Sequence, residues 1–259
     1  MGNTILTDIK DGVFIVTLNR PAVFNALNTE ILAELNAAIQ LATDDAAIRV
    51  VVLQGTEGAF CSGADLKEGL ANAGMPLGQK LKESYEPLIR GMRNLAKPII
   101  CKLNGVAAGA GMSLALACDI IYADEETYMS ELFVGIGLMP DAGSMYFLPR
   151  LVGAQRAFEL MSTGRKVYMK EALELGLVAS VFPKNALDEA VSKLAAFYAQ
   201  APTFAIGQMK KVLNSSFNSS LEEVLQKEAE GQTLCGISAD FGEGVMAFLQ
   251  KRKPEFKGK

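Results

Sequence analysis

The sequence contains no histidine among its 259 residues, and this absence removes several classes of catalytic site. Ser-His-Asp and Cys-His nucleophiles cannot be assembled within the chain. Zinc and iron sites that depend on histidine ligands are excluded for the same reason. No side chain has an ordinary pKa near neutrality. Proton transfer would therefore need a carboxylate, lysine, tyrosine or cysteine whose pKa its surroundings have shifted.

Excess positive charge, paired cysteines and long apolar runs are also missing. The net charge is −4, whereas broad binding to nucleic acid or to an anionic membrane needs a basic surface. The four cysteines show no CxxC pairing, and no apolar run approaches the roughly 20 residues that cross a bilayer. We therefore expect reduced thiols, a cytoplasmic location, and neither nucleic acid nor membrane as a partner.

The hydrophobic pattern predicts an α/β fold followed by a helical region. Half of the residues are hydrophobic, which is enough for a sizeable core. The first part of the chain alternates predicted strands (13–18, 49–54, 99–103, 119–123) with predicted helices (28–43, 79–95, 106–117). Later segments are almost wholly helical (154–162, 170–175, 186–200, 202–214, 220–233, 239–251), with one short strand at 178–182. We expect an α/β core over 1–200 and a helical C-terminal region over 201–259.

Two glycine-rich segments follow predicted strands. They are Phe60–Leu66 (FCSGADL) and Asn104–Gly111 (NGVAAGAG). Small residues let the backbone approach a ligand, and the start of a helix leaves free N–H groups. Two such segments at neighbouring strand ends could direct two N–H groups at one oxygen, which is an oxyanion hole. For each segment alone, a tight turn or close helix packing is the favoured interpretation, and Gly109-x-Gly111 lacks the rest of a dinucleotide fingerprint.

A third segment contains Asp141, which stands between Pro140 and Ala142-Gly143, just before a predicted helix. One interpretation makes Asp141 the N-cap of that helix. The other is a general base whose pKa is raised by apolar neighbours. From these residues alone the cap is favoured.

Taken together, these segments resemble the enoyl-CoA hydratase/isomerase family, also called the crotonase superfamily. The resemblance runs through nearly the whole chain, from Leu18–Pro21 to Lys251-Arg252. It implies a crotonase-like spiral of ββα units and a helical C-terminal trimerisation region, assembled as a homotrimer or a dimer of trimers. The implied substrate is an acyl-CoA thioester. No metal or separate cofactor is implied, because CoA arrives as part of the substrate.

The resemblance also implies a set of site residues. The thioester oxygen would lie between the backbone N–H groups of Ala64 and Ala110, which would stabilise an enolate. Contacts to the substrate or its CoA portion are implied for nine residues, the last two of them from this chain or from a neighbouring subunit: Ala22, Gly63, Asp65, Leu66, Lys67, Gly109, Phe133, Phe256 and Lys257. Solvated surface is an equal interpretation for Lys67, Phe256 and Lys257.

Two departures from the family pattern narrow the expected chemistry. Hydratases of the family use two glutamates, but Ser113 and Phe133 stand at those positions here. Glu131 is two residues out of register and, on a strand, would share the face of Phe133. Asp141 falls where relatives such as the epoxyphenylacetyl-CoA isomerases of phenylacetate breakdown keep a catalytic aspartate. We therefore predict an acyl-CoA isomerase in which Asp141 removes a proton at one carbon and returns it at another.

Two other functions stay open at this point. One is a hydratase that adds water to a 2-enoyl-CoA with the help of Asp141 or Glu131. The other is a non-catalytic CoA-binding subunit, which the missing glutamate pair suggests. Hydrolytic dehalogenation is disfavoured, because relatives with that chemistry also use histidine.

Overall fold

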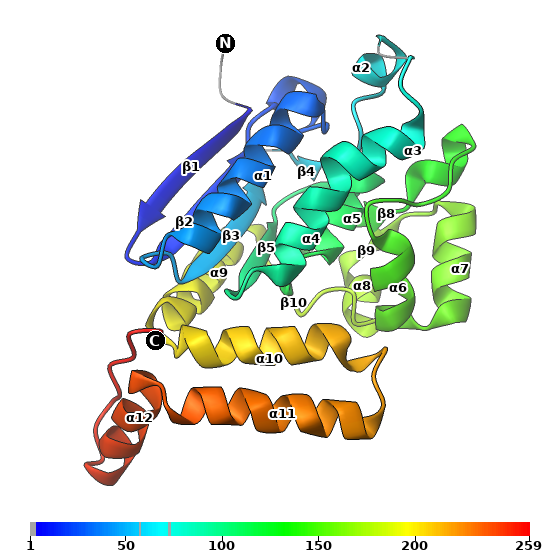
Figure 1. The fold of residues 1–259 in the computed structure, drawn as a ribbon. Coiled ribbons are helices and arrows are strands. Elements are labelled where there is room, and N and C mark those ends of the chain that lie inside the picture. Colours follow the sequence, from blue (N-terminus) through cyan, green and yellow to red (C-terminus); the bar gives the residue numbers. More distant parts are fainter. Residues whose placement is uncertain (1–3, 57, 72–73) are drawn as a thin grey trace.

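The computed structural model describes residues 4–56, 58–71 and 74–259, which form two sheets surrounded by helices (Figure 1). The main sheet has the strand order β1-β2-β3-β5-β7-β10. Its members are β1 (Ile5–Lys10), β2 (Val13–Leu18), β3 (Val50–Gly55), β5 (Ile99–Leu103), β7 (Ile120–Asp124) and β10 (Ser180–Phe182). The β1–β2 pair is antiparallel and the other pairs are parallel.

A smaller sheet lies beside it, with the order β4-β6-β8-β9. Its strands are β4 (Ala59–Cys61), β6 (Val106–Ala108), β8 (Tyr128–Ser130) and β9 (Val167–Tyr168). Along the chain, β3 is followed by β4, β5 by β6, and β7 by β8, and helices come after each pair. Each turn therefore adds one strand to each sheet, which confirms the spiral of ββα units. The sequence pattern predicted none of the four strands of the small sheet, because strands of two or three residues are too short to show alternation.

The helices that follow the first strands confirm two predictions and correct one. Helix α1 (Thr29–Asp44) begins after Asn28, whose side chain accepts a hydrogen bond from the backbone N–H of Ile31 at 3.0 Å. The predicted helix 79–95 is present, but π-helix η2 (Leu81–Tyr85) lies between α3 (Leu77–Lys80) and α4 (Glu86–Asn94). The predicted helix 106–117 is wrong at its start. Strand β6 occupies 106–108, and α5 (Ala110–Leu116) begins only after Gly109, whose φ is +52°.

The prediction contains no helix at α2 (Leu66–Ala71). The other helices lie within a few residues of their predicted positions: α6 (Ser144–Val152), α7 (Ala154–Thr163), α8 (Met169–Glu174), α9 (Lys184–Gln200), α10 (Thr203–Ser216), α11 (Leu221–Gly236) and α12 (Ala239–Leu249). Figure 1 shows α10, α11 and α12 extending beyond the sheets as a separate layer. In the described ranges, no helix is both long enough and apolar enough to span a membrane.

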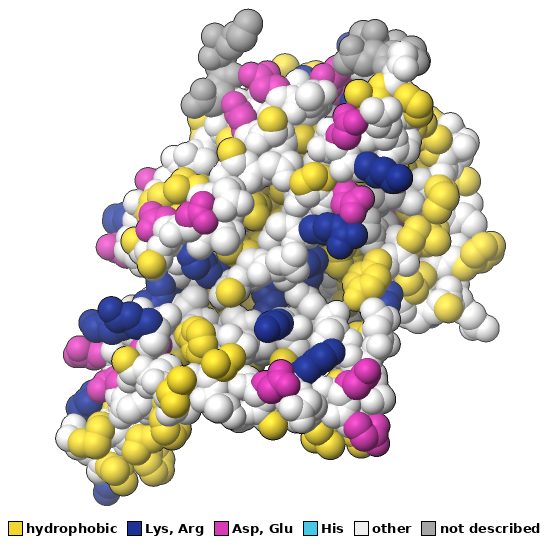
Figure 2. All heavy atoms as spheres, viewed as in Figure 1, with side chains coloured by type: hydrophobic (Ala, Val, Ile, Leu, Met, Phe, Trp, Pro, Cys, Tyr) yellow, Lys and Arg dark blue, Asp and Glu magenta, His cyan; other side chains and the backbone are white. Residues whose placement is uncertain are grey.

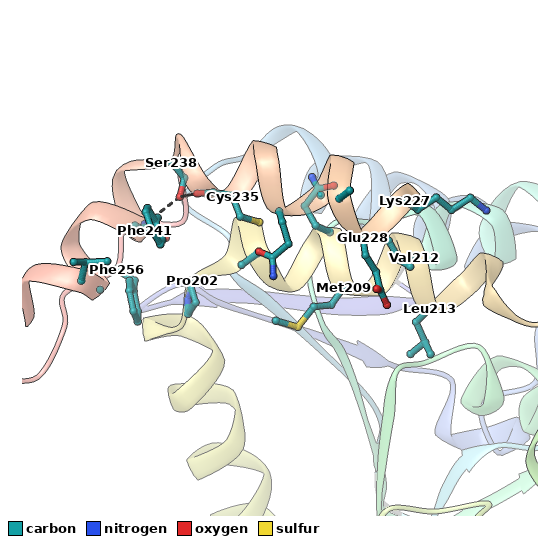
Figure 3. Close-up of a pocket in the computed structure, with 18 of the residues that line it drawn as sticks. Pro202, Met209, Val212, Leu213, Lys227, Glu228, Cys235, Ser238, Phe241 and Phe256 are labelled. Atoms are coloured by element: carbon teal, nitrogen blue, oxygen red, sulfur yellow. Dashed lines mark hydrogen bonds between the residues drawn. The ribbon is translucent and has the colours of Figure 1, made fainter. Parts of the chain in front are cut away.

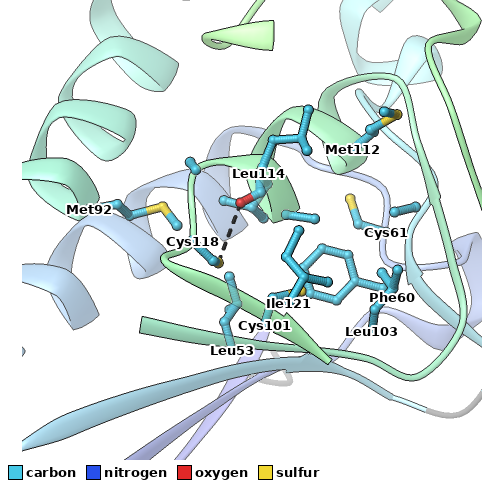
Figure 4. Close-up of a cluster of buried hydrophobic side chains, with 14 of the residues drawn as sticks. Leu53, Phe60, Cys61, Met92, Cys101, Leu103, Met112, Leu114, Cys118 and Ile121 are labelled. Atoms are coloured by element: carbon cyan, nitrogen blue, oxygen red, sulfur yellow. Dashed lines mark hydrogen bonds between the residues drawn. The ribbon is translucent and has the colours of Figure 1, made fainter. Parts of the chain in front are cut away.

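Two hydrophobic layers cover the main sheet, one on each face. In β3, Val51 and Leu53 point into the larger layer, while Val50 and Val52 point toward α9 on the other side. This double burial explains the continuous apolar run of that strand. Figure 4 shows the larger layer where it approaches the site, with Phe60, Cys61, Met112 and Leu114 packed over the sheet.

A buried lysine fastens the C-terminal layer to the core. Lys210, on α10, donates hydrogen bonds to the carbonyls of Met92 (2.9 Å) and Lys97 (3.2 Å) and pairs with the Asp119 carboxylate at 2.7 Å. Arg93 holds the other oxygen of Asp119 at 2.9 Å. Because a buried ammonium ion is costly unless it is paired, these contacts fix the position of α10.

We predict that Lys210→Met lowers the free energy of unfolding by about 1–3 kcal/mol, because it removes the ammonium donor that the Met92 and Lys97 carbonyls share with the Asp119 carboxylate. Urea denaturation measures the change. The matched control is Lys211→Met at the exposed neighbouring position, with an expected change within about 0.5 kcal/mol. Equal effects of the two substitutions would contradict a fastening role for Lys210.

Candidate active site

Two glycines bring the loop after β4 against the loop after β6. Gly63 has a φ of +103°, which side-chain-bearing residues rarely adopt. A Cβ atom added there would lie 2.9 Å from the Ala108 carbonyl oxygen and 3.5 Å from the Ala110 nitrogen. A Cβ atom at Gly111 would lie only 2.3 Å from the carbonyl oxygen of Cys61. Larger residues at these positions would therefore separate the two loops.

The predicted oxyanion donors lie in these two loops. Within the described part of the chain, the backbone N–H groups of Ala64 and Ala110 donate to no acceptor. Their neighbours are occupied: Leu27 and Gly63 form one backbone hydrogen bond (2.7 Å), and Asp65 donates to Leu27 at 2.9 Å. These bonds hold Ala64 in a short bridge to Leu27 while its own N–H stays free.

Asp141 lies in the turn between 3-10 helix η3 (Leu132–Ile136) and α6. The N-cap of α6 is Gly143, and no side chain caps the helix, so the N-cap interpretation of Asp141 is wrong. The Oδ1 atom of Asp141 is buried and accepts no hydrogen bond from the described residues. Burial raises the pKa of this carboxyl group to about 6. This is the change that a general base working near neutrality needs.

Side-chain hydrogen bonds connect α5 to the Asp141 turn. The Ser113 hydroxyl donates to the Ser144 hydroxyl at 3.1 Å, and Ser144 donates to Glu131 Oε1 at 2.5 Å. Ser113 lies three residues after Ala110, and Ser144 lies three residues after Asp141. The network therefore brings the second oxyanion segment and the candidate base to one place.

Glu131 differs from its sequence interpretation. It precedes η3 rather than lying on a strand, so strand alternation with Phe133 does not apply. Its side chain is 1% exposed, and its Oε2 atom has no partner among the described residues. Burial, followed by the nearby Asp141 carboxylate, raises the pKa of Glu131 to about 7, although the Ser144 hydrogen bond opposes this rise. A second buried carboxyl group thus lies close to Asp141.

The phenyl ring of Phe133 lies beside the Asn104–Gly111 segment, which carries the Ala110 donor. It is buried, and a Cβ atom at Gly109 would lie 3.9 Å from its Cζ atom. The ring therefore lies against the backbone just before the Ala110 donor.

Residues expected to contact CoA fall into two separate regions. Ala22 lies in 3-10 helix η1 (Pro21–Val23), beside the Ser62 segment, and Leu66 and Lys67 are exposed at the start of α2. The Asp65 carboxylate is already engaged: it pairs with Arg20 at 3.0 Å and accepts from the backbone N–H groups of Lys67 and Glu68. Its observed contacts shape the loop.

Phe256 and Lys257 lie beside α12, away from the other candidate residues. The Phe256 ring packs against Gly244, and the backbone N–H of Lys257 donates to Asp240 at 2.6 Å. Figure 3 shows Phe256 with Phe241 and Pro202 at one end of an apolar groove between α10, α11 and α12. Within one chain, the structure does not bring Phe256 and Lys257 to Asp141.

Sequence reasoning missed two residues of this region. Tyr85 falls within the predicted helix 79–95 and gave no sign of a functional role, yet its buried hydroxyl has no partner among the described residues. Ser144 gave no signal, because one serine at the start of a helix is common. Among all the residues that the structure describes, no cluster of three or more Cys, Asp or Glu side chains could hold a metal ion.

Comparison with known proteins places this architecture in a family. The sequence model described as enoyl-CoA hydratase/isomerase matches residues 8–259. A probable enoyl-CoA hydratase of Rhodobacter capsulatus is 40% identical over 257 residues, covering 99% of each chain. The 1,2-epoxyphenylacetyl-CoA isomerase of Escherichia coli is 39% identical over 258 residues, covering 98% of each chain.

The fold agrees with these sequence matches. The crystal structure of a putative enoyl-CoA hydratase from Streptomyces coelicolor A3(2) has a TM-score of 0.93 and 35% identity, covering 99% of this chain and 94% of that one. The two-sheet spiral, the paired glycine segments and matches along nearly the whole length lead to one conclusion. The chain belongs to the enoyl-CoA hydratase/isomerase family.

Proposed function

We propose that this chain is an acyl-CoA isomerase that shifts a double bond, or rearranges a ring, through a thioester enolate. The observation that carries the proposal is the Asp141 carboxyl group: its Oδ1 atom is enclosed and accepts no hydrogen bond from the described residues, and burial raises its pKa to about 6. Such a group is ionised at neutral pH and can still give its proton back. CoA enters as part of the substrate.

The proposed reaction needs one carboxylate and two backbone donors. Asp141 removes a proton from a carbon whose carbanion is conjugated with the thioester carbonyl. The electron pair of that C–H bond moves onto the carbonyl oxygen. The N–H groups of Ala64 and Ala110 stabilise the negative charge on this oxygen. Asp141 then returns the proton to a different carbon, and the enolate collapses to the rearranged thioester. Atoms and charge balance without a further reactant.

The residues at the hydratase positions support isomerisation over hydration. Ser113 is fully buried, and its hydroxyl donates within the Ser144 network. Phe133 presents an apolar ring beside Gly109. Neither residue can activate a water molecule as a glutamate pair would.

Hydration is the second candidate, because Glu131 supplies another buried carboxyl group near Asp141. In that reaction, one carboxyl group would position water and the other would protonate the substrate. A mass gain of one water from a 2-enoyl-CoA identifies this outcome, whereas isomerisation leaves the mass unchanged. Binding without turnover of any thioester would instead support a CoA-binding subunit.

We also propose that the chain assembles as a homotrimer or a dimer of trimers through α10–α12. Apolar side chains gather over α12, as Figure 2 shows at the lower end of the molecule, and Phe248 is 83% exposed. Exposed apolar surface of this kind is typical of an interface between subunits. A neighbouring chain could then bring its Phe256 and Lys257 to the CoA portion of the substrate.

We predict that Asp141→Asn lowers kcat/KM for enoyl-CoA isomerisation by about 100- to 10,000-fold, the usual contribution of a general base. Deuterium uptake from heavy water, measured by mass spectrometry, follows the reaction. The variant should stay folded, because it removes the cost of ionising a buried carboxyl group. Asp8→Asn, at an exposed position of β1, is the control and should leave the rate unchanged. Undiminished exchange in Asp141→Asn would contradict the assignment.

The acid limb of the pH profile gives a second test. Because the base must be ionised, kcat/KM should rise with pH and level off above about 6, the pKa of Asp141. Replacing Glu131 by Gln should leave this midpoint near 6, because burial raises the pKa of Asp141 and Glu131, with a pKa of about 7, is still largely protonated when Asp141 ionises. A midpoint near 4 in the wild type would show that a solvent-exposed carboxylate is acting instead.

The assembly proposal predicts a particle mass of three or six times 27.7 kDa in light scattering coupled to size-exclusion chromatography. Phe248→Glu should shift the distribution toward the monomer, since a charge cannot be buried cheaply in an apolar interface. Lys193→Glu, at an exposed position of α9, serves as the control. A monomeric wild type at micromolar concentration would overturn the proposal.

A further inference from the structure

Tyr85 is a buried residue that the proposed reaction does not use. It lies at the end of π-helix η2, directly before α4, and its side chain is only 4% exposed. Its hydroxyl oxygen has no hydrogen-bond partner among the residues that the structure describes. Single π turns often occur at functional sites, because they redirect a side chain within a helix. Leaving a buried hydroxyl unpaired typically costs about 1–3 kcal/mol, so a partner is to be expected.

The helix that carries Tyr85 packs directly on the Asp141 turn. Ile89, in α4, lies one helical turn after Tyr85, so the two side chains point to the same side. A Cβ atom added to Gly143 would lie 3.4 Å from Cγ2 of Ile89. Tyr85 belongs to the same buried cluster as Cys61, Ala110 and Phe133.

Charges from both sides of the site act on the Tyr85 hydroxyl. Burial raises its pKa most, and the Asp141 carboxylate raises it further, followed by Cys61, Glu68 and Asp65. Asp65 lies in the loop that carries the Ala64 donor, Cys61 ends the strand before that loop, and Glu68 lies in α2 after it, while Asp141 lies in the turn before α6. The phenol is thus placed between the oxyanion loop and the candidate base, and it stays protonated across the physiological pH range.

We propose that the Tyr85 hydroxyl donates a hydrogen bond to an oxygen atom on the acyl group. The site therefore prefers acyl-CoA thioesters that carry a hydroxyl, oxo or epoxide oxygen over those with plain hydrocarbon chains. This inference rests on the proposed function, since it assumes that an acyl group lies between Ala64, Ala110 and Asp141. Sites with buried polar groups reject analogues that leave those groups unpaired.

Binding measurements test this preference without any need for turnover. The probes are phenylacetyl-CoA and its 2-, 3- and 4-hydroxy derivatives, each differing from the parent by one oxygen. Isothermal titration calorimetry gives the dissociation constants for the wild type and Tyr85→Phe. The matched control is Tyr122→Phe, which removes a phenol hydroxyl from β7, where the ring packs against Phe182 near α9.

In the wild type, at least one hydroxy derivative should bind about tenfold more tightly than phenylacetyl-CoA, the scale of one good hydrogen bond. Tyr85→Phe should abolish this preference and change the affinity for phenylacetyl-CoA by no more than about twofold, whereas Tyr122→Phe should retain the preference. A preference that survives in Tyr85→Phe, or that is absent from the wild type, would overturn the inference. Equal weakening of all four probes would also overturn it, because it would indicate a packing role. Failure of the wild type to turn over any enoyl thioester would contradict the proposed function but would not alter this binding result.

Discussion

The close approach of two backbone segments, at Gly63 and Gly111, is the constraint on which the candidate site depends. Neither approach tolerates a side chain, because a Cβ atom would lie 2.9 Å from one carbonyl oxygen or 2.3 Å from another. Beside this contact, the N–H groups of Ala64 and Ala110 donate to no acceptor among the residues that the structure describes. Two donors preorganised by the fold need no rearrangement when charge develops on the substrate, and this is what makes such sites effective.

The Asp141 side of the site depends on burial, whereas the side formed by the Gly63 and Gly111 segments depends on close packing. The Asp141 carboxyl group is shielded by its turn and by α4, and its pKa rises to about 6 as a result. The Ser113–Ser144–Glu131 network connects the Asp141 turn to α5, the helix that begins at the Ala110 donor. A site of this kind separates two tasks: backbone groups hold the developing charge and a single side chain moves the proton. The absence of histidine from the chain is consistent with a carboxylate taking that second task.

Much of the fold could be predicted from the sequence, because short apolar strand segments and helical periodicity dominate it. The family resemblance correctly indicated the spiral, and the glycine segments indicated where the backbone approaches itself. The surroundings of the side chains could not be predicted. Glu131 was placed on a strand, whereas it precedes a 3-10 helix and is fully buried. The isolation of the Tyr85 hydroxyl depends on contacts between segments distant in the chain, which no local pattern records.

The proposed function depends on an Asp141 carboxyl group that the fold shields from solvent and that therefore exchanges a proton near neutrality. NMR titration of protein labelled with ¹³C at the aspartate carboxyl carbons measures this directly, and the Asp141 signal is identified by its loss in Asp141→Asn. The account predicts a midpoint near pH 6. A midpoint near 4, the ordinary value for aspartate, would show a solvated carboxylate and contradict the account.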